Sequence, residues 1–340
     1  MQVFATMSER MSATEVVEHA RRVEAMGYDG LLVPEAVHDG FLTSMAALTA
    51  TERLRITTSV LVVFPRSPMI VAHAAWDLQA LSGGRFELGL GTQVRGNIVD
   101  RFSTPWTSPV PRMREYVESL KAIFHTFQTG EKLHYEGEHY RFTRLQPFFN
   151  PGPLEVPAPP ILLGAVGPDM TRMAGGAADG LMTHPTNSSA RYLADVTLPR
   201  LAEGAERRGR RASDCPILAA GFVATGPDAD AVREKREWVR EYFTFLYSTP
   251  AYWPSLDHNG FGDVGRRLHE LTREGRWDDM KGLITDEIID TLVPQGPYGE
   301  IAAILRDLYS PVAERITFPL PDDPSLDAEA ARVIADLQAD

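Results

Sequence analysis

The sequence has only one cysteine, fewer cationic than anionic residues, and no long apolar run. Cys215 alone forms neither an intrachain disulfide nor a thiolate metal cluster, which fits a reducing compartment. The 34 lysine and arginine residues against 46 aspartate and glutamate residues give a formal net charge of -12, which argues against binding to nucleic-acid phosphates. No stretch approaches the roughly 18 apolar residues that span a bilayer, and the first residues lack a signal-peptide pattern. We therefore expect a cytoplasmic protein that binds neither nucleic acid nor membranes.

Several catalytic signatures are missing as well. The nine histidines include no H-x-x-x-H pair, and the sequence predicts no metal site. The chain contains neither a G-x-S-x-G motif nor a Walker loop, so a hydrolase or a kinase has little support.

What the sequence does contain is material for a large core, with 44% hydrophobic and 24% charged residues in 340. Length alone leaves one or two domains open, because α/β barrels of roughly 200 to over 400 residues fold as single domains. Eight extended apolar segments alternate with amphipathic helical patterns. The segments that we expect to form strands are residues 2–6, 30–35, 55–64, 85–92, 159–165, 180–184, 216–225 and 314–320.

Eight strand-and-helix units in one chain favour a TIM-type (β/α)8 barrel over an open doubly wound sheet. We predict a single domain over residues 1–340 with insertions at about 129–158 and 249–296. The first insertion contains an exposed hairpin at 133–142, and the second is less regular, with two short helical patterns. The aromatic residues of the second insertion could form a lid, a dimer face or core; they are Tyr252, Trp253, Phe261 and Trp277.

Local signals mark the starts of the helices. Ser12 and Glu15 form the pattern of a capping box, and Ser67 before Pro68 is typical of a capped helix start. The other expected helices cover residues 43–52, 112–128, 167–178, 189–208, 228–247 and 296–309.

In a TIM barrel the active site lies at the carboxyl ends of the strands, so the residues directly after each strand are the candidates. After the second strand stand Glu35, His38 and Asp39, where an imidazole beside carboxylates suits proton transfer. A solvated loop histidine is the alternative interpretation of His38.

Glycines and polar residues follow the fourth and fifth strands. Gly91, Thr92 and Asn97 follow the fourth, with a glycine spacing that does not match the dinucleotide fingerprint G-x-G-x-x-G. After the fifth, Gly164 and Gly167 precede Pro168 at a helix start, which would expose backbone N–H groups to a phosphate. Asp169 could instead complement the helix dipole itself.

Taken together, these segments resemble the luciferase-like flavin and deazaflavin oxidoreductases, and most closely the branch that uses coenzyme F420. The resemblance rests on the joint occurrence of "AMGYDGLLVPE", "TTSVLVVFPRSPMIVAHAAWDLQALSGGRFELGLGTQ", "YEGEHYRF", "PPILLGAVGPDMTRMAGGAADG" and "PQGPYGEIAAIL". It implies a barrel with insertions that is usually a homodimer, with the cofactor ring across the strand ends.

The resemblance also assigns residues. It implies a bulge with a non-prolyl cis peptide under the ring at Ser59 and Val60. Ring and ribityl contacts are implied for Gly91, Thr92 and Asn97, and phosphate contacts for Gly164, Gly167, Pro168, Asp169 and Met170. Related dehydrogenases carry an adjacent Asp-His pair, whereas here Ala36 and Val37 separate Glu35 from His38. The catalytic histidine is carried onto His38, with Glu35 or Asp39 as its acidic partner.

The function implied is hydride transfer between F420 and an organic small molecule, with His38 handling a proton. The alternatives are a monooxygenase that uses reduced FMN and oxygen, and a catalytically silent flavin-binding barrel.

Overall fold

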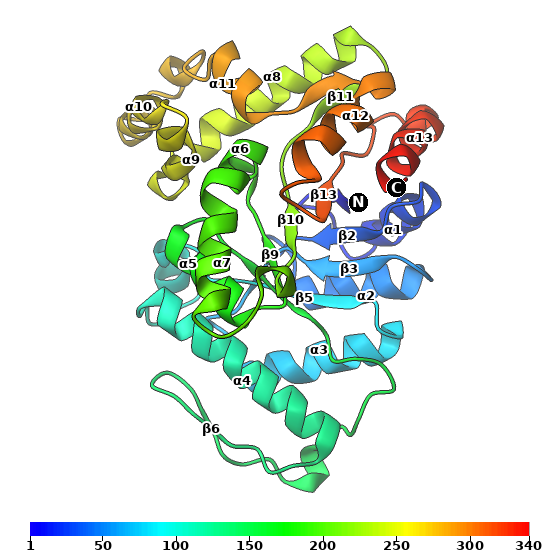
Figure 1. Cartoon of the computed structure of the whole chain (residues 1–340), viewed down its shortest axis with the longest axis vertical. Helices are drawn as coiled ribbons and strands as arrows, with labels where there is room; N and C mark the ends of the chain where they lie inside the picture. The colour runs from blue at the N-terminus through cyan, green and yellow to red at the C-terminus, as the bar shows by residue number, and fades with distance from the viewer. Residues whose placement is uncertain (340) are drawn as a thin grey trace.

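Parallel strands close into a barrel in the computed structural model, which describes residues 1–339 (Figure 1). Nine strand segments pair around the barrel, and two of them, β3 and β4, are halves of one interrupted strand. The segments are β1 (Gln2–Thr6), β2 (Gly30–Val33), β3 (Arg55–Thr58), β4 (Leu61–Val62), β5 (Phe86–Gly91), β8 (Ile161–Gly164), β9 (Gly180–Met182), β10 (Ile217–Ala219) and β13 (Arg315–Thr317). Because β1 pairs with both β2 and β13, and β5 with both β3 and β8, the ring is closed. The predicted (β/α)8 barrel is confirmed.

The surrounding helices begin where the local signals place them. Ser12 and Glu15 exchange backbone hydrogen bonds of 2.8 and 3.3 Å before α1, and Ser67 accepts the N–H of Met69 at the start of α3. The helices around the barrel are α1 (Glu15–Ala25), α2 (Gly40–Ala50), α3 (Pro68–Ser82), α4 (Pro109–Thr129), α5 (Pro168–Ala177), α6 (Ala190–Tyr192), α7 (Leu198–Glu206), α12 (Tyr298–Tyr309) and α13 (Asp327–Gln338). The sequence interpretation missed α13.

Two predicted elements are wrong in detail. The expected strand 216–225 is split, because the chain leaves the barrel after β10 and pairs as β11 (Ala224–Gly226) with β12 (Gln295–Pro297). The carbonyl of Gly221, between the two segments, accepts a hydrogen bond from Thr317 rather than joining the ladder. The expected helix 189–208 is interrupted by a π-helical turn at Leu193–Thr197, and Pro199 stands in the first turn of α7.

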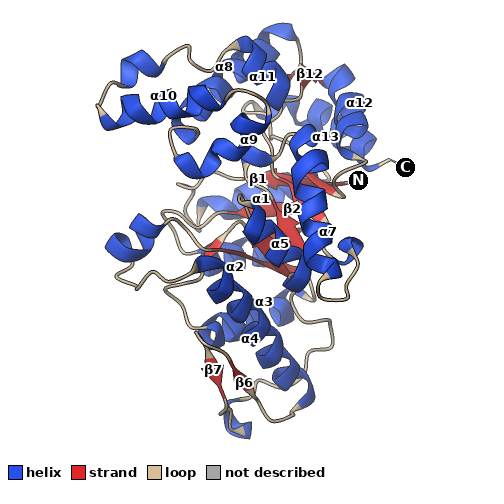
Figure 2. Ribbon diagram, turned by 60° about the vertical axis from the view of Figure 1, so that its left-hand side comes forward, coloured by secondary structure: helices blue, strands red, loops and turns tan. Residues whose placement is uncertain are grey.

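The second insertion is more regular than the sequence indicated. It contains three helices, α9 (Trp253–His258), α10 (Gly262–Arg273) and α11 (Asp286–Leu292), which share an apolar core with α8 (Ala229–Leu246), the helix predicted over residues 228–247. We call residues 229–292 the helical insertion. Figure 2 shows it at one end of the molecule, with the hairpin of β6 (Tyr135–Glu136) and β7 (Arg141–Phe142) at the other end. The exposed hairpin is confirmed, since Glu136 and Arg141 are exposed.

Apolar side chains fill the interior of the barrel, and an ion pair closes its amino end. The interior cluster comprises Phe4, Leu32, Leu162, Met182 and Leu218, with Val60 and Ala220 packed against it. At the amino end of the strands, Glu87 accepts hydrogen bonds from Thr57 at 2.8 Å and from Arg315 at 2.9 Å. The interior is therefore a packed core, and any ligand must bind on top of it. No helix within residues 1–339 has the length and apolarity to cross a membrane.

Candidate active site

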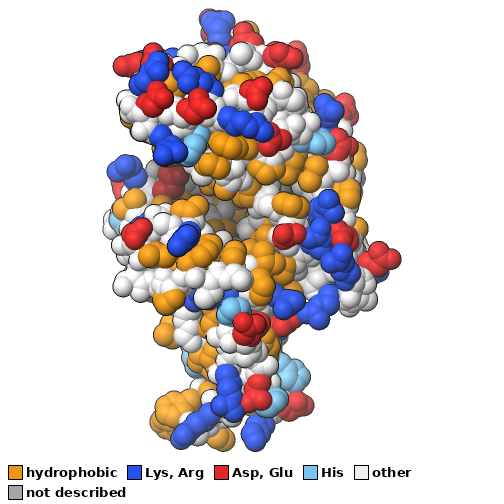
Figure 3. Space-filling model, turned by 90° about the vertical axis from the view of Figure 1, so that its left-hand side faces the viewer, with side chains coloured by type: hydrophobic (Ala, Val, Ile, Leu, Met, Phe, Trp, Pro, Cys, Tyr) orange, Lys and Arg blue, Asp and Glu red, His pale blue; other side chains and the backbone are white. Residues whose placement is uncertain are grey.

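The carboxyl ends of the strands lie beneath the helical insertion. Tyr242 of α8 donates a hydrogen bond of 3.3 Å to Glu9, which follows β1, and Tyr247 donates one of 3.0 Å to the carbonyl of Thr186, which follows β9. Figure 3 shows this face of the molecule, with a hollow below the insertion and hydrophobic side chains around it. We call this region the barrel mouth.

Val60 forms the centre of the mouth floor. Its side chain is half-buried and rests on the apolar interior of the barrel. A Cβ added to Gly91 would lie 2.2 Å from Cγ2 of Val60, and one added to Gly164 would lie 2.8 Å from its Cγ1. Glycine is thus required at both positions by close approach. The peptide bond between Ser59 and Val60 is cis, as predicted.

Glu35 is bound to Arg66 and to the backbone of the interrupted strand. Its carboxylate accepts hydrogen bonds from two nitrogens of Arg66, at 2.6 and 2.9 Å, and from the N–H of Val62 at 2.7 Å. Arg66 also donates to Asp39 at 2.9 Å, and Asp39 caps α2. Burial alone would lower the pKa of Arg66, but hydrogen bonds and charge from Glu35 and Asp39 outweigh it and raise the pKa.

His38 is half-buried in the loop after β2 and forms no hydrogen bond with any described residue. Neither Glu35 nor Asp39 contacts its ring by a hydrogen bond, because both carboxylates bind Arg66. The expected carboxylate–histidine pair is therefore not formed in this structure. The loop itself is held by Arg101, which donates to the carbonyl of Ala36 at 2.5 Å.

The start of α5 is open. Gly167 is the N-cap in an extended conformation with no side-chain cap, and a Cβ added there would meet nothing within 4 Å. The N–H groups of Asp169 and Met170 lie in the first turn and have no acceptor within the helix. The carboxylate of Asp169 pairs with Arg172 at 2.5 Å. These backbone donors are free to bind an anion.

Thr92 and Asn97, in the loop after β5, are half-buried. Their side chains form no hydrogen bond with the described residues, and Asn97 begins a π-helical turn. Gln93 between them has a φ of 58°, a conformation that is uncommon for a residue with a side chain.

One site residue was missed by the sequence interpretation. His184 follows β9 by two positions, and its Nδ1 lies 2.8 Å from Oγ1 of Thr186. Its ring stacks on Tyr252 of the helical insertion, with 4.4 Å between ring centroids and 1° between planes. Burial lowers the pKa of His184 to about 4. The signal was available, because His184 ends the strand segment "GLMTH".

The sequence profile of the family described as "Luciferase-like monooxygenase" matches residues 2–315. The chain belongs to this family.

Relatives of this luciferase-like chain include an uncharacterized protein of Mycobacterium tuberculosis, which is 42% identical over 86% of each chain. An F420-dependent glucose-6-phosphate dehydrogenase of Nakamurella multipartita is 31% identical, and the match covers 69% of this chain and 71% of that protein.

Solved structures share the fold. The coenzyme F420 dependent tetrahydromethanopterin reductase from Methanopyrus kandleri has a TM-score of 0.77 at 18% identity, over 98% of this chain and 97% of that one. The oxygenating constituent of 3,6-diketocamphane monooxygenase from Pseudomonas putida, in complex with FMN, has a TM-score of 0.66 at 15% identity, over 99% and 96%. These structures show that the luciferase-like chain has the (β/α)8 fold, and its family and its F420-dependent relative make it an oxidoreductase.

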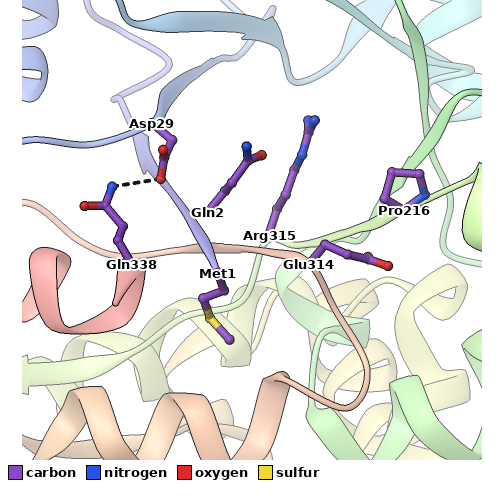
Figure 4. Close-up of a pocket in the computed structure, with 7 residues that line it drawn as sticks. All are labelled: Met1, Gln2, Asp29, Pro216, Glu314, Arg315 and Gln338. Atoms are coloured by element: carbon purple, nitrogen blue, oxygen red, sulfur yellow. Dashed lines mark hydrogen bonds between the residues drawn. The ribbon is translucent and has the colours of Figure 1, made fainter. Parts of the chain in front are cut away.

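A second depression of about 630 Å³ lies at the opposite end of this luciferase-like barrel (Figure 4). It is lined by residues at the amino ends of β1, β10 and β13, among them Gln2, Pro216 and Arg315. Figure 4 shows Gln338 of α13 donating to Asp29 there, at 2.8 Å. Residues at the amino end of a TIM barrel stabilise the fold, whereas catalytic residues lie at the carboxyl end. We therefore place the active site at the barrel mouth.

Proposed function

We propose that this chain is an F420-dependent oxidoreductase that transfers a hydride between the deazaflavin and an organic small molecule. The observation that carries the proposal is the continuity of the mouth: Val60 touches Gly164, and three residues later Gly167 opens the start of α5. A flat ring over Val60 and a phosphate at α5 would thus be bound by adjacent parts of one surface. Relatives that use F420 support this choice of cofactor.

The residues present fit such a cofactor. Val60 gives the ring an apolar support, and the polar side-chain groups of Thr92 and Asn97 have no hydrogen-bond partner among the described residues. The phosphate would bind at Gly167, Pro168, Asp169 and Met170, where backbone donors are free and no side chain fills the space. Gly91 and Gly164 shape the floor, and Ser59 joins it to β3.

When bound, F420 supplies a ring carbon that accepts or gives a hydride. The chain supplies orientation, exclusion of water under the helical insertion, and a proton-handling group. We assign that group to His38, whose ring forms no hydrogen bond within residues 1–339. Glu35 acts through Arg66 and Val62 as a positioning residue for the interrupted strand.

An FMN-dependent monooxygenase is the second candidate, supported by the structural similarity to an FMN-bound monooxygenase. The same phosphate site would suit either cofactor. A silent cofactor-binding barrel would bind the cofactor without any substrate-dependent change in its absorbance.

We also propose that the chain forms a homodimer through α2 and α3. These helices pack side by side, and Leu42 and Ile70 are 64% and 65% exposed on them, together with Met45. Exposed apolar side chains on adjacent helices suit a contact with a second copy of the same face.

Titration of the purified protein with F420 and with FMN, followed by cofactor fluorescence, tests the proposal. Anaerobic turnover with F420 would support it. Binding of FMN alone, with turnover only in the presence of oxygen, would support the monooxygenase.

A further inference from the structure

We propose that His184 binds an oxygen atom of the substrate through its Nε2–H group, and that the substrate is a neutral carbonyl or hydroxyl compound. This inference rests on the proposed function, because it needs a hydride partner above Val60.

The hydrogen bonds of His184 define which ring nitrogen carries the proton. The backbone N–H of Thr186 points at Nδ1 from 3.4 Å, and the hydroxyl of Thr186 lies 2.8 Å from the same atom. A backbone N–H only donates, so Nδ1 is an acceptor and carries no proton. A neutral imidazole then carries its proton on Nε2, which makes Nε2 a donor.

Nε2 of His184 is available to a ligand. It has no hydrogen-bond partner within residues 1–339. It nevertheless reaches solvent, because it is absent from the set of buried polar atoms that lack a partner. Burial is the one cause that shifts the pKa of His184, and it lowers that pKa to about 4. The ring is therefore neutral at higher pH and keeps its single proton. Between pH 6 and 8 the ring is therefore a neutral donor rather than a cation.

Contacts of the ring and of its loop hold His184 in place. One face stacks on Tyr252, and the loop is fixed where Tyr247 donates to the carbonyl of Thr186. The preceding residue, Thr183, accepts the N–H of Ala220 at 3.1 Å, which ties the loop to the end of β10. A donor fixed in this way needs little reorganisation when charge develops on a bound oxygen.

His184 and His38 lie across the mouth from each other. Four steps around the barrel, through β1, β13, β10 and β9, separate β2 from β9 in a ring of eight strands. A substrate between them meets a neutral donor on one side and the proposed proton-handling group on the other.

The composition of the loops on this side of the mouth favours a neutral substrate. The loops after β9, β10 and β13, residues 183–190, 220–228 and 318–324, contain no lysine or arginine. They do contain Asp228, Asp322 and Asp323. Lys235 of α8 is near this side, but it already lies 3.9 Å from Asp322. A phosphate or carboxylate group would find no lysine or arginine on these three loops.

The proposed roles account for the hydride and the proton in both directions of the reaction. In reduction, the hydride joins the substrate carbon, the oxygen takes a proton from the proton-handling group, and His184 donates a hydrogen bond without losing its own proton. In oxidation, the same atoms move in reverse. Loss of one such donor typically lowers turnover roughly 10²- to 10³-fold.

The first test measures the ring itself. Nitrogen NMR of the histidine side chains, assigned with His184→Gln, should show an Nε2–H neutral ring from pH 6 to 8 in the protein without substrate. A proton on Nδ1, or a protonation midpoint above pH 6, would overturn the assignment whether or not the chain uses F420.

The second test uses the F420-loaded protein without oxygen. Cyclohexanone and 2-butanone, with their alcohols, are compared with glucose 6-phosphate by the visible absorbance of the cofactor. We expect turnover of neutral compounds only, a loss of about 100-fold in kcat/KM for His184→Phe, partial rescue by His184→Gln, and unchanged F420 affinity in both. His258→Gln, which alters a histidine bound to Asp195, is the matched control.

Equal turnover by His184→Phe and the wild type, preference for the phosphorylated compound, or no turnover of any neutral compound would overturn the inference. Failure of F420 to bind at all would count against the proposed function, and the NMR measurement would then decide the role of His184 separately.

Discussion

Glu35 and Arg66 are joined by two parallel hydrogen bonds, of 2.6 and 2.9 Å, at the edge of the barrel mouth. The same carboxylate accepts the N–H of Val62, and Arg66 donates to the carbonyl of Val62 at 2.7 Å. The pair therefore holds the strand that resumes after Val60. Glu35 is 9% exposed, so solvent screens this pair less than a surface pair.

We expect Glu35→Gln to lower the free energy of unfolding by about 1–3 kcal/mol, since it leaves a partly buried guanidinium with less compensation. Chemical denaturation measures the change. Glu136→Gln, in the exposed pair with Arg141, is the control and should leave the stability almost unchanged, because solvent screens that pair. Lost turnover at unchanged stability would instead make Glu35 part of the proton-handling group.

Replacing His38 by Gln should leave the affinity for F420 unchanged and lower turnover by roughly 10²- to 10⁴-fold, the usual contribution of general acid–base catalysis. Fluorescence titration and anaerobic kinetics separate the two effects. The control is His134→Gln, on the exposed hairpin. Unchanged turnover in the His38 variant would remove the role from this residue.

Gly91 and Gly167 should respond differently to alanine. At Gly91 the new Cβ would lie 2.2 Å from Val60, so we expect a loss of stability of about 1–3 kcal/mol. At Gly167 it would meet nothing within 4 Å, so stability should hold while F420 affinity falls about tenfold. Thermal unfolding and fluorescence titration test the two predictions. Full affinity in Gly167→Ala would argue against a phosphate at α5.

The lowered pKa of His184 predicts a stability that depends on pH. Its folded pKa of about 4 is below the value of about 6.5 in the unfolded chain, so the unfolded chain binds the proton more tightly. Stability is complete above about pH 6.5 and declines as the pH falls toward 4. Relative to His184→Gln, the wild type should lose on the order of 2–3 kcal/mol between pH 7 and pH 4. If the free energies of unfolding of the two proteins changed with pH in the same way, the ring of His184 would not be buried and neutral.

The proposed dimer has its own test. Leu42→Glu with Ile70→Glu should shift the protein from a dimer to a monomer in analytical ultracentrifugation, since two charges would be buried against the partner copy. Leu308→Glu changes an exposed leucine on α12 and should leave the mass unchanged. A monomeric wild type would contradict the proposal.

The sequence predicted the barrel because its signals are local. Strand and helix periods, the Ser12–Glu15 box and the Ser67–Pro68 start all depend on neighbouring residues, and the structure confirms them. The floor residues Val60, Gly91 and Gly164 were found through their positions at strand ends and the family resemblance. They come together because three neighbouring strands end there.

Contacts between distant residues could not be predicted in the same way. Glu35 binds Arg66, which lies 31 residues further along the chain. The sequence spacing does not favour this pair over a pair of Glu35 with His38. His184 becomes notable only when Tyr252 of the helical insertion packs on its ring. Residues 249–296 looked irregular because α9 and α11 have only 6 and 7 residues and pack on a core that they share with α8 and α10.

The central claim is that F420 is the working cofactor. The most direct measurement is the anaerobic titration of the protein with F420 and with FMN, followed by addition of a neutral ketone to the reduced protein and its alcohol to the oxidised one. We predict saturable F420 binding and a substrate-dependent change in its absorbance without oxygen. Binding of FMN but not F420, with product formed only when oxygen is admitted, would contradict the account.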